Sequence, residues 1–200
     1  MLLAQVLLEH GANVNARDKR GSTPLYFALS SEQLAVAQVL LSHGADVEAQ
    51  NQYNQTLLHQ ADDEKDSRLL LKHGADANAL DIQNRTPLHH ASEYGRVEVA
   101  QVLLEHGVDA NARDSNNATP LHMASGSSVN LNDEILDAVR LLLQYGSDIH
   151  ARDDKGRTPF MRAKEMERQD IMQLLLERGA EDLSQDVMRT EGERDVRAVV

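Results

Sequence analysis

One short motif, Thr-Pro-Leu-His or a close variant of it, recurs five times along the 200-residue chain. The motif begins at Thr23, Thr56, Thr86, Thr119 and Thr158, with intervals of 33, 30, 33 and 39 residues. A second motif, Leu-Leu-x-x-Gly, follows the same rhythm and ends at Gly11, Gly44, Gly74, Gly107, Gly146 and Gly179. Two independent motifs that share one period, and depart from it at the same two places, indicate a linear array of one repeated unit.

Each residue of these motifs suits one end of a short helix. Threonine is a helix N-cap whose hydroxyl can accept a hydrogen bond from a free backbone N–H. Proline follows at the first helical position, where its missing N–H costs nothing. The chain has only four prolines and all occupy this position: Pro24, Pro87, Pro120 and Pro159. The glycine of the second motif suits the end of a helix, where the backbone turns left-handed. The motifs therefore predict where helices begin and end.

Two apolar-periodic stretches separate each threonine from the next motif glycine. In the third copy they span residues 88–94 and 97–105, and Gly95 stands between them, which predicts an antiparallel helix pair. A short segment then leads to a position where only glycine or asparagine occurs: Gly21, Asn54, Asn84, Asn117 and Gly156. These residues tolerate positive φ best, so the position is expected to be the tip of a tight turn.

This unit of turn, helix and helix resembles the ankyrin repeat over about residues 1–183. The resemblance implies an all-α solenoid of L-shaped repeats, with β-hairpin fingers projecting from the helices. It also implies a concave surface, formed by fingers and first helices, that binds other proteins. The expected divisions are a leading half repeat at 1–17, repeats at 18–50, 51–80, 81–113 and 114–152, a C-terminal capping repeat at 153–183, and a disordered tail at 184–200.

The ends of the array depart from the repeat pattern. Residues 2–10 match a second helix whose first helix is missing, so Leu2, Leu3, Val6 and Leu7 are expected to lack a covering neighbour. Our hypothesis is that the chain is a fragment of a longer array or the product of a truncated gene model. The last repeat carries a polar second helix, which suits a C-terminal cap.

Two internal repeats differ in length. The repeat that begins near Thr56 is three residues short and has Leu57 in place of proline. Its second helix is expected to lose nearly a turn, which would make this unit the weakest of the stack. The Thr119 repeat is six residues long, and the extra residues are expected to form a flexible loop over residues 126–132.

Composition excludes several classes of protein. The net charge of −12 argues against nucleic acid as the main partner, because phosphate binding needs a basic surface. The chain has no cysteine, so it can form no disulfide and no cysteine-based metal site, which fits an intracellular protein of the cytoplasm or nucleus. It contains no apolar run of membrane-spanning length. We therefore expect no nucleic acid and no membrane among its partners.

The sequence offers no site for catalysis or for a metal. Histidines such as His59, His89 and His122 recur at equivalent positions of adjacent repeats, which lie about 10 Å apart. A shared zinc needs each nitrogen about 2 Å away, so these histidines are expected to hydrogen-bond within their turns instead. No phosphate loop and no Ser/His/Asp arrangement occurs. We predict that the chain is not an enzyme and needs no cofactor.

The expected binding residues are those at the family's variable finger and first-helix positions. In this chain they are Lys19, Arg20, Tyr26, Tyr53, Gln55, Ile82, Arg85, His90, Asn116, Met123, Lys155, Arg157 and Arg162. The excess of arginine and lysine suggests a neutral to basic surface that binds a protein with an acidic or mixed segment. The simplest alternative is that these turn tips are ordinary solvated loops.

The predicted function is protein–protein recognition by an adaptor, scaffold or inhibitor. The chain is expected to be monomeric unless its uncapped N-terminus self-associates. A second hypothesis is that it is a targeting or regulatory segment of a larger enzyme or signalling protein.

Overall fold

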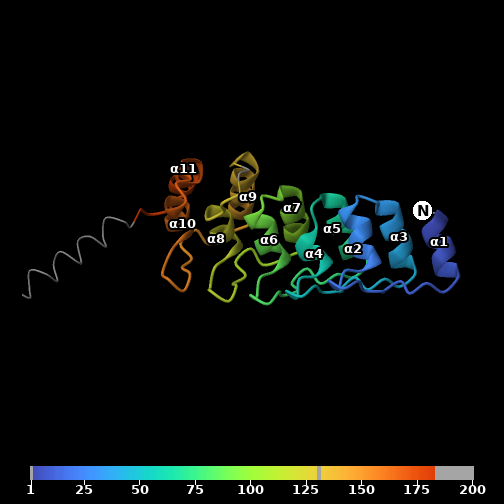
Figure 1. Cartoon of the computed structure of the whole chain (residues 1–200). Coiled ribbons are helices and arrows are strands. Elements are labelled where there is room, and N and C mark those ends of the chain that lie inside the picture. The colour runs from blue at the N-terminus through green and yellow to red at the C-terminus, as the bar shows by residue number, and fades with distance from the viewer. Residues whose placement is uncertain (1, 130–131, 183–200) are drawn as a thin grey trace, which may run out of the picture.

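The computed structural model describes residues 2–129 and 132–182 of the chain. These residues form an elongated stack of helices with α1 at one end and α11 at the other, and the loops that join the repeats project from one side (Figure 1). In chain order the helices are α1 (Leu2–Glu9), α2 (Pro24–Ser30), α3 (Leu34–Ser42), α4 (Leu57–Gln60), α5 (Glu64–Lys72), α6 (Pro87–Glu93), α7 (Val97–Glu105), α8 (Pro120–Ser125), α9 (Asn132–Gln144), α10 (Pro159–Glu165) and α11 (Gln169–Glu177). The expected tail at 184–200 lies outside the described residues.

The motif threonines begin the first helix of each repeat, as predicted. Thr23, Thr119 and Thr158 are extended N-caps whose hydroxyls accept hydrogen bonds from backbone N–H groups 3.3, 3.4 and 3.3 Å away, in the first turn of α2, α8 and α10. All four prolines stand in the first turn of a first helix. Local cap chemistry thus sets where these helices begin.

The asparagines at the turn tips adopt the left-handed conformation that the sequence predicts. Asn54, Asn84 and Asn117 have φ values of 57°, 56° and 57°. Each tip is closed by a preceding Asp or Asn side chain. In the third repeat, for example, an Asp81 carboxylate oxygen accepts the N–H groups of Gln83 and Arg85 at 2.8 and 3.0 Å.

The fingers are tight turns joined by single backbone hydrogen bonds, and no strand forms in the part of the chain that the structure describes. The Ile82 N–H donates to the Tyr53 carbonyl at 3.0 Å, and the Ser115 N–H donates to the Gln83 carbonyl at 2.8 Å. The expectation of β-hairpin fingers is therefore wrong in detail: one such bond in each of three neighbouring pairs of fingers aligns them but does not build a ladder.

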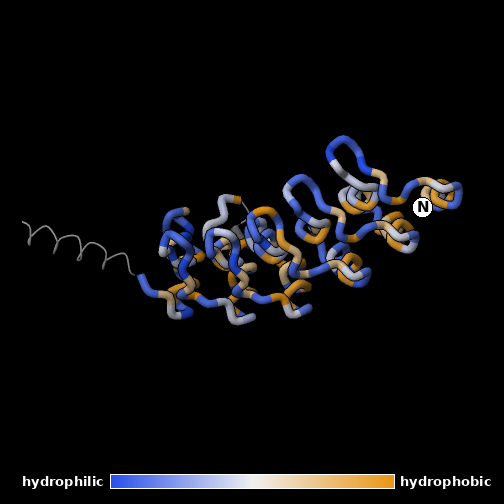
Figure 2. Tube along the Cα trace, turned by 90° about the horizontal axis from the view of Figure 1, so that it is seen from below, coloured by the Kyte–Doolittle hydropathy of each residue, from blue (hydrophilic) through white to orange (hydrophobic). Residues whose placement is uncertain are grey.

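The core is a continuous apolar layer between adjacent helix pairs. Hydrophobic segments gather in the helices and hydrophilic ones in the connecting turns (Figure 2). One aliphatic or aromatic side chain of each first helix is almost fully buried, and an alanine three residues later is buried with it, as in Leu88 and Ala91 of α6 and Phe160 and Ala163 of α10. The small alanine lets the next helix pair approach closely, so each unit is stabilised mainly by its neighbours.

The short repeat loses helix in a different place from the one predicted. Its second helix, α5, has nine residues, as do α3 and α7, whereas its first helix, α4, has only four against seven in α2 and α6. The prediction that the second helix is shortened is wrong. The Leu-Leu-x-x-Gly end of the unit keeps its packing, and the deletion removes the last turn of α4.

The six-residue insertion lengthens a helix as well as a loop. Helix α9 has 13 residues and rises above α7 in Figure 1. Part of the expected loop at 126–132 is thus helical from Asn132 onward, and residues 130–131 lie outside the described part. The Ser127 hydroxyl donates to the Glu93 carbonyl at 2.7 Å, which ties the start of this loop to the preceding repeat.

Three of the four apolar side chains of α1 that the sequence predicts to be uncovered are exposed, and the side chain of Leu2 lies outside the described part. Leu3, Val6 and Leu7 are 72%, 42% and 52% exposed. An apolar hollow of about 370 Å³ lies between α1 and α2, with Leu7, Leu8 and Phe27 in its lining.

Candidate functional site

The predicted binding residues differ widely in exposure. Six are exposed on the fingers or their tips: Lys19, Arg20, Tyr53, Ile82, Asn116 and Lys155. Six are half-buried: Tyr26, Gln55, Arg85, Met123, Arg157 and Arg162. His90 is buried, with 5% of its surface exposed. The surface of finger tips and first helices, which we name the finger face, thus contains both exposed side chains and side chains that are packed into the array.

Two groups of these residues converge on separate hollows of the finger face. The first finger hollow, of about 460 Å³, is lined by Arg20, Tyr26, Tyr53 and Gln55 from the first two repeats. The second finger hollow, of about 300 Å³, is lined by residues of the last three repeats, among them Arg85, Asn116, Met123, Lys155, Arg157 and Arg162. Lys19, Ile82 and His90 line neither hollow.

Two of the predicted arginines are neutralised by carboxylates of their own repeats. Arg85 contacts Asp81 at 3.2 Å and Glu93 at 3.1 Å. Arg157 repeats the arrangement, with Asp153 at 2.7 Å and Glu165 at 3.0 Å. The structure therefore does not support the expectation of a neutral to basic finger face at these positions, because each guanidinium faces two acids.

The shared carboxylate is firmly ionised in both cases. Burial alone would raise the pKa of Asp81, but hydrogen bonds from His90, Arg85 and Gln83 outweigh it and lower the pKa to about 2. The pKa of Asp153 is also lowered, because hydrogen bonds from Arg157 outweigh its burial. These acids order the finger turn and its arginine together.

His90 is part of an internal cluster and does not face a partner. Its Nε2 lies 2.9 Å from the Asp81 carboxylate, and burial lowers the pKa of its ring to about 4. The ring meets the edge of His59 at 5.4 Å and stacks with Tyr94 at 6.5 Å. We correct the prediction for His90 accordingly: the position belongs to the finger face in sequence, but its side chain turns inward toward Asp81.

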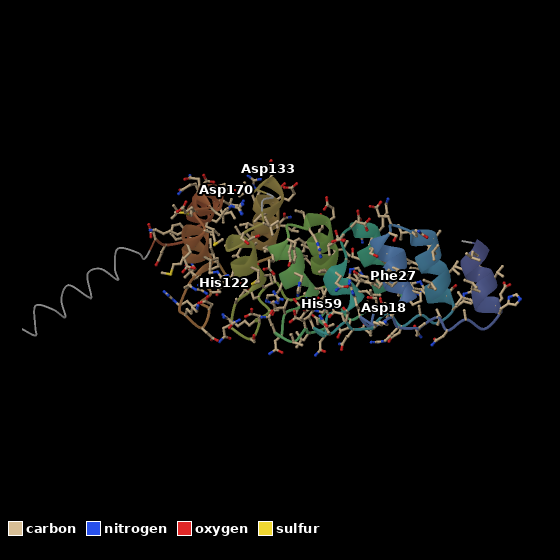
Figure 3. All side chains as sticks on the ribbon, viewed as in Figure 1. Asp18, Phe27, His59, His122, Asp133 and Asp170 are labelled. Carbon is tan, nitrogen blue, oxygen red and sulfur yellow. The ribbon has the colours of Figure 1, made fainter. Side chains whose placement is uncertain are left out.

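The motif histidines connect each repeat to the next one. In His59, His89 and His122 the Nδ1 atom accepts the N–H of the threonine that caps the same helix, at 3.1 to 3.2 Å. Nε2 must then carry the proton, and it lies 3.0, 3.2 and 2.9 Å from a backbone carbonyl in the following repeat. His59 and His122 lie where their first helices meet the fingers (Figure 3). Burial lowers the pKa of all three.

In the described part of the chain, no group of three or more His, Asp or Glu side chains is placed to hold a metal ion. None of the helices there is both long and apolar enough to cross a membrane.

A third hollow was missed by the sequence analysis. It has about 480 Å³, lies between the first two repeats, and has Glu32, Asp62, Asp63 and Asp66 in its lining. We name it the acidic hollow. The sequence carries one signal for it, at the position eight residues before each motif glycine. The short repeat has Asp66 at this position. The other complete repeats have an aliphatic residue there: Val36, Val99, Ala138 and Ile171.

Comparison with known families agrees with this architecture. The family model described as "Ankyrin repeats (3 copies)" matches four overlapping stretches, residues 2–51, 48–114, 63–153 and 110–186. A search of curated proteins found no match. Ankyrin repeats are in general modules for protein–protein interaction and are typically not enzymes. Because these matches span nearly the whole array, the chain belongs to the ankyrin-repeat family.

Proposed function

We propose that this array is a recognition module, acting as an adaptor, scaffold or inhibitor, that binds a protein partner through its finger face. The observation that carries this proposal is the convergence of predicted variable residues on the two finger hollows. Variable side chains that merely solvated the turn tips would have no reason to gather in this way.

The chemistry of the two finger hollows suits a polypeptide ligand. Tyr26 and Tyr53 give the first one aromatic surface next to the amides of Gln55 and Gln60, which can hydrogen-bond a peptide backbone. The second one contains Met123, an adaptable apolar side chain, among charged and amide groups. Tyrosine and arginine are also the residue types that most often dominate binding energy at protein interfaces.

The test is a comparative pull-down from lysate with three forms of the protein. The finger-face variant changes Arg20, Tyr53, Asn116 and Lys155 to Ala, all exposed residues that line the finger hollows. The matched control variant changes Gln38, Lys72, Glu98 and Gln144 to Ala, all exposed on second helices. Melting temperatures of the three forms should agree, which establishes that any loss of capture is not due to unfolding.

We expect a protein that is captured by the parent and the control variant and lost from the finger-face variant. Capture that survives in the finger-face variant, or a parent that retains no protein, would contradict the proposal.

A further inference from the structure

The acidic hollow lies where the short repeat lacks the last turn of its first helix. Helix α4 ends at Gln60, and the chain reaches the start of α5 through Asp62 and Asp63. In the next repeat, the first helix continues to Glu93 and Tyr94 follows as its C-cap. The missing turn leaves a space of about 480 Å³ between α2, α4 and α5.

Asp66 occupies a core position in this space. It stands where the other complete repeats carry Val36, Val99, Ala138 and Ile171, and of these Val99, Ala138 and Ile171 are at most 1% exposed. Asp66 itself is 8% exposed and lines the acidic hollow. A carboxylate has therefore replaced an aliphatic side chain at one repeat of the array.

The carboxylate of Asp66 has no partner within the described residues: only burial and like charges act on it, and no hydrogen bond or cation is among the groups that shift its pKa. Asp66 is the third residue of α5, where an acid can close a capping box by accepting the N–H of the N-cap, but no such bond to Asp63 forms. An ionised carboxylate that is largely removed from water without a partner destabilises a fold, and the Asp66 carboxylate retains access only to the hollow. Its presence is explained if a ligand supplies the missing cation.

The surrounding charges favour the same ligand. Burial raises the pKa of Asp66 most, and the nearby carboxylates of Asp63, Asp62 and Glu32 raise it further, to about 6. The one basic residue in the lining, Arg96, contacts Asp62 at 2.7 Å. Three carboxylates thus remain without an arginine or lysine partner among the described residues that line the hollow.

The rest of the lining suits the stem of a long cationic side chain. Leu29, Leu57 and Ala61 provide apolar surface, and Tyr26 provides an aromatic ring. An aliphatic stem packs on such a wall while its charged head reaches the acids, and a guanidinium can also stack on the ring. Tyr26, Leu57 and Gln60 line both the acidic hollow and the first finger hollow, so the two hollows lie side by side.

We propose that the acidic hollow receives an arginine or lysine side chain of the protein partner, with Asp66 as its principal anion. This inference rests on the proposed function, because it names the chemistry of the segment that the finger face binds. It reverses the expectation that the partner presents an acidic segment, at least at the first two repeats.

The test is an NMR titration of the full chain with four short peptides. The probes are acetyl-Gly-Arg-Gly-amide and its lysine, citrulline and norleucine counterparts, of which citrulline keeps the shape of arginine without its charge. The arginine peptide, the lysine peptide or both should shift the amide signals of residues 60–66 saturably, with a dissociation constant on the order of 1 mM. The neutral peptides should not.

Three variants separate binding from folding. Asp66→Asn keeps the shape and removes the charge, and Asp66→Val restores the aliphatic residue of the other repeats. We expect both to weaken binding of the cationic peptides at least about tenfold, because a buried charge pair is lost. Asp133→Asn, which changes an exposed acid at the start of α9, is the control and should leave binding unchanged.

Binding of the citrulline or norleucine peptide as tight as that of the cationic peptides would overturn the proposal. So would undiminished binding by Asp66→Asn, or no saturable shift in the parent at about 10 mM peptide. None of the residues changed in the pull-down lines the acidic hollow, so failure here leaves the proposed recognition function to its own test.

Discussion

At the scale of single residues, buried histidines and carboxylates connect the repeats. His59, His89 and His122 each satisfy a cap in their own repeat and a carbonyl in the next. Each of these three histidines therefore places a neutral imidazole between two neighbouring repeats. Protonation of its Nδ1 would break the hydrogen bond that this atom accepts from the threonine N–H. Lowered pKa values mean that these rings favour folding above pH 6.5, and this contribution is lost as the pH falls through their folded-state values.

Asp66 has the opposite dependence on pH. Its pKa is raised from 3.8 to about 6 in the folded protein, so its ionised form opposes folding above pH 6 and this penalty disappears toward pH 4. We predict that Asp66→Val raises the free energy of unfolding by about 1–2 kcal/mol at pH 7, because solvent in the hollow screens part of the charge penalty. The gain over the parent should shrink at pH 5, where the parent carboxylate is largely protonated.

Urea unfolding of both proteins at pH 7, 6 and 5 measures this difference. Asp133→Asn serves again as the control, since replacing this exposed side chain should leave the free energy of unfolding nearly unchanged. A gain that stayed constant from pH 7 to 5 would mean that the buried charge is not its cause.

Much of the residue-level chemistry could be predicted from sequence, because caps and turn tips depend on the residues within one turn. Thr23, Pro24 and Asn84 all behave as expected. The environments of Arg85 and His90 could not be predicted in this way. Both depend on Asp81, whose carboxylate is drawn inward by the finger turn, and a pattern of variable positions does not show which way a side chain turns.

At the scale of elements, we expect the short helix α4 to be the weak point of the stack. A first helix of four residues has few internal hydrogen bonds and depends on its neighbours for stability. The sequence showed that three residues are missing but not from which helix, because the turn between helices and the end of α4 are both polar. Helix α5 keeps its full length, which indicates that packing of the leucine-rich second helix constrains the repeat more than the length of its first helix does.

We predict that lengthening α4 stabilises the array. Inserting Ser-Glu-Tyr, the sequence of residues 92–94, between Ala61 and Asp62 would make the short repeat as long as the third repeat. The added turn should fill the acidic hollow with side chains and raise the melting temperature by about 2–4 °C, as about 1 kcal/mol would in a chain of this size. Calorimetry of the parent and the insertion variant measures the change.

A Gly-Ser-Gly insertion at the same point is the control, since it adds length without helix propensity or apolar surface. Equal melting temperatures for both insertions would show that the loss of the turn is not what weakens this unit.

At the scale of the whole molecule, stability is distributed along a line. Each helix pair contacts the pair before it and the pair after it, and apolar burial is spread over the full length of the array. Such arrays can separate into independently unfolding parts where one interface is weakened. The period of the sequence predicts the stacking of helix pairs. The short α4, the long α9 and the hollows of the finger face arise from differences between repeats, which the period does not describe.

We predict that one substitution has different effects at the middle and at the end of the array. Leu103 and Leu175 stand four residues before their motif glycines, and both are 0% exposed. Changing either to Ala removes the same buried atoms, at a cost of about 2–5 kcal/mol. Leu103→Ala weakens the third repeat, which joins the halves, so urea unfolding should become two separate transitions. Leu175→Ala should unfold the last repeat at low urea and leave the main transition near its original midpoint.

Circular dichroism with residue-specific hydrogen exchange distinguishes these outcomes, because exchange shows which repeats open first. A single transition shifted equally in both variants would mean that the array unfolds as one cooperative unit and that its repeats are not energetically separable.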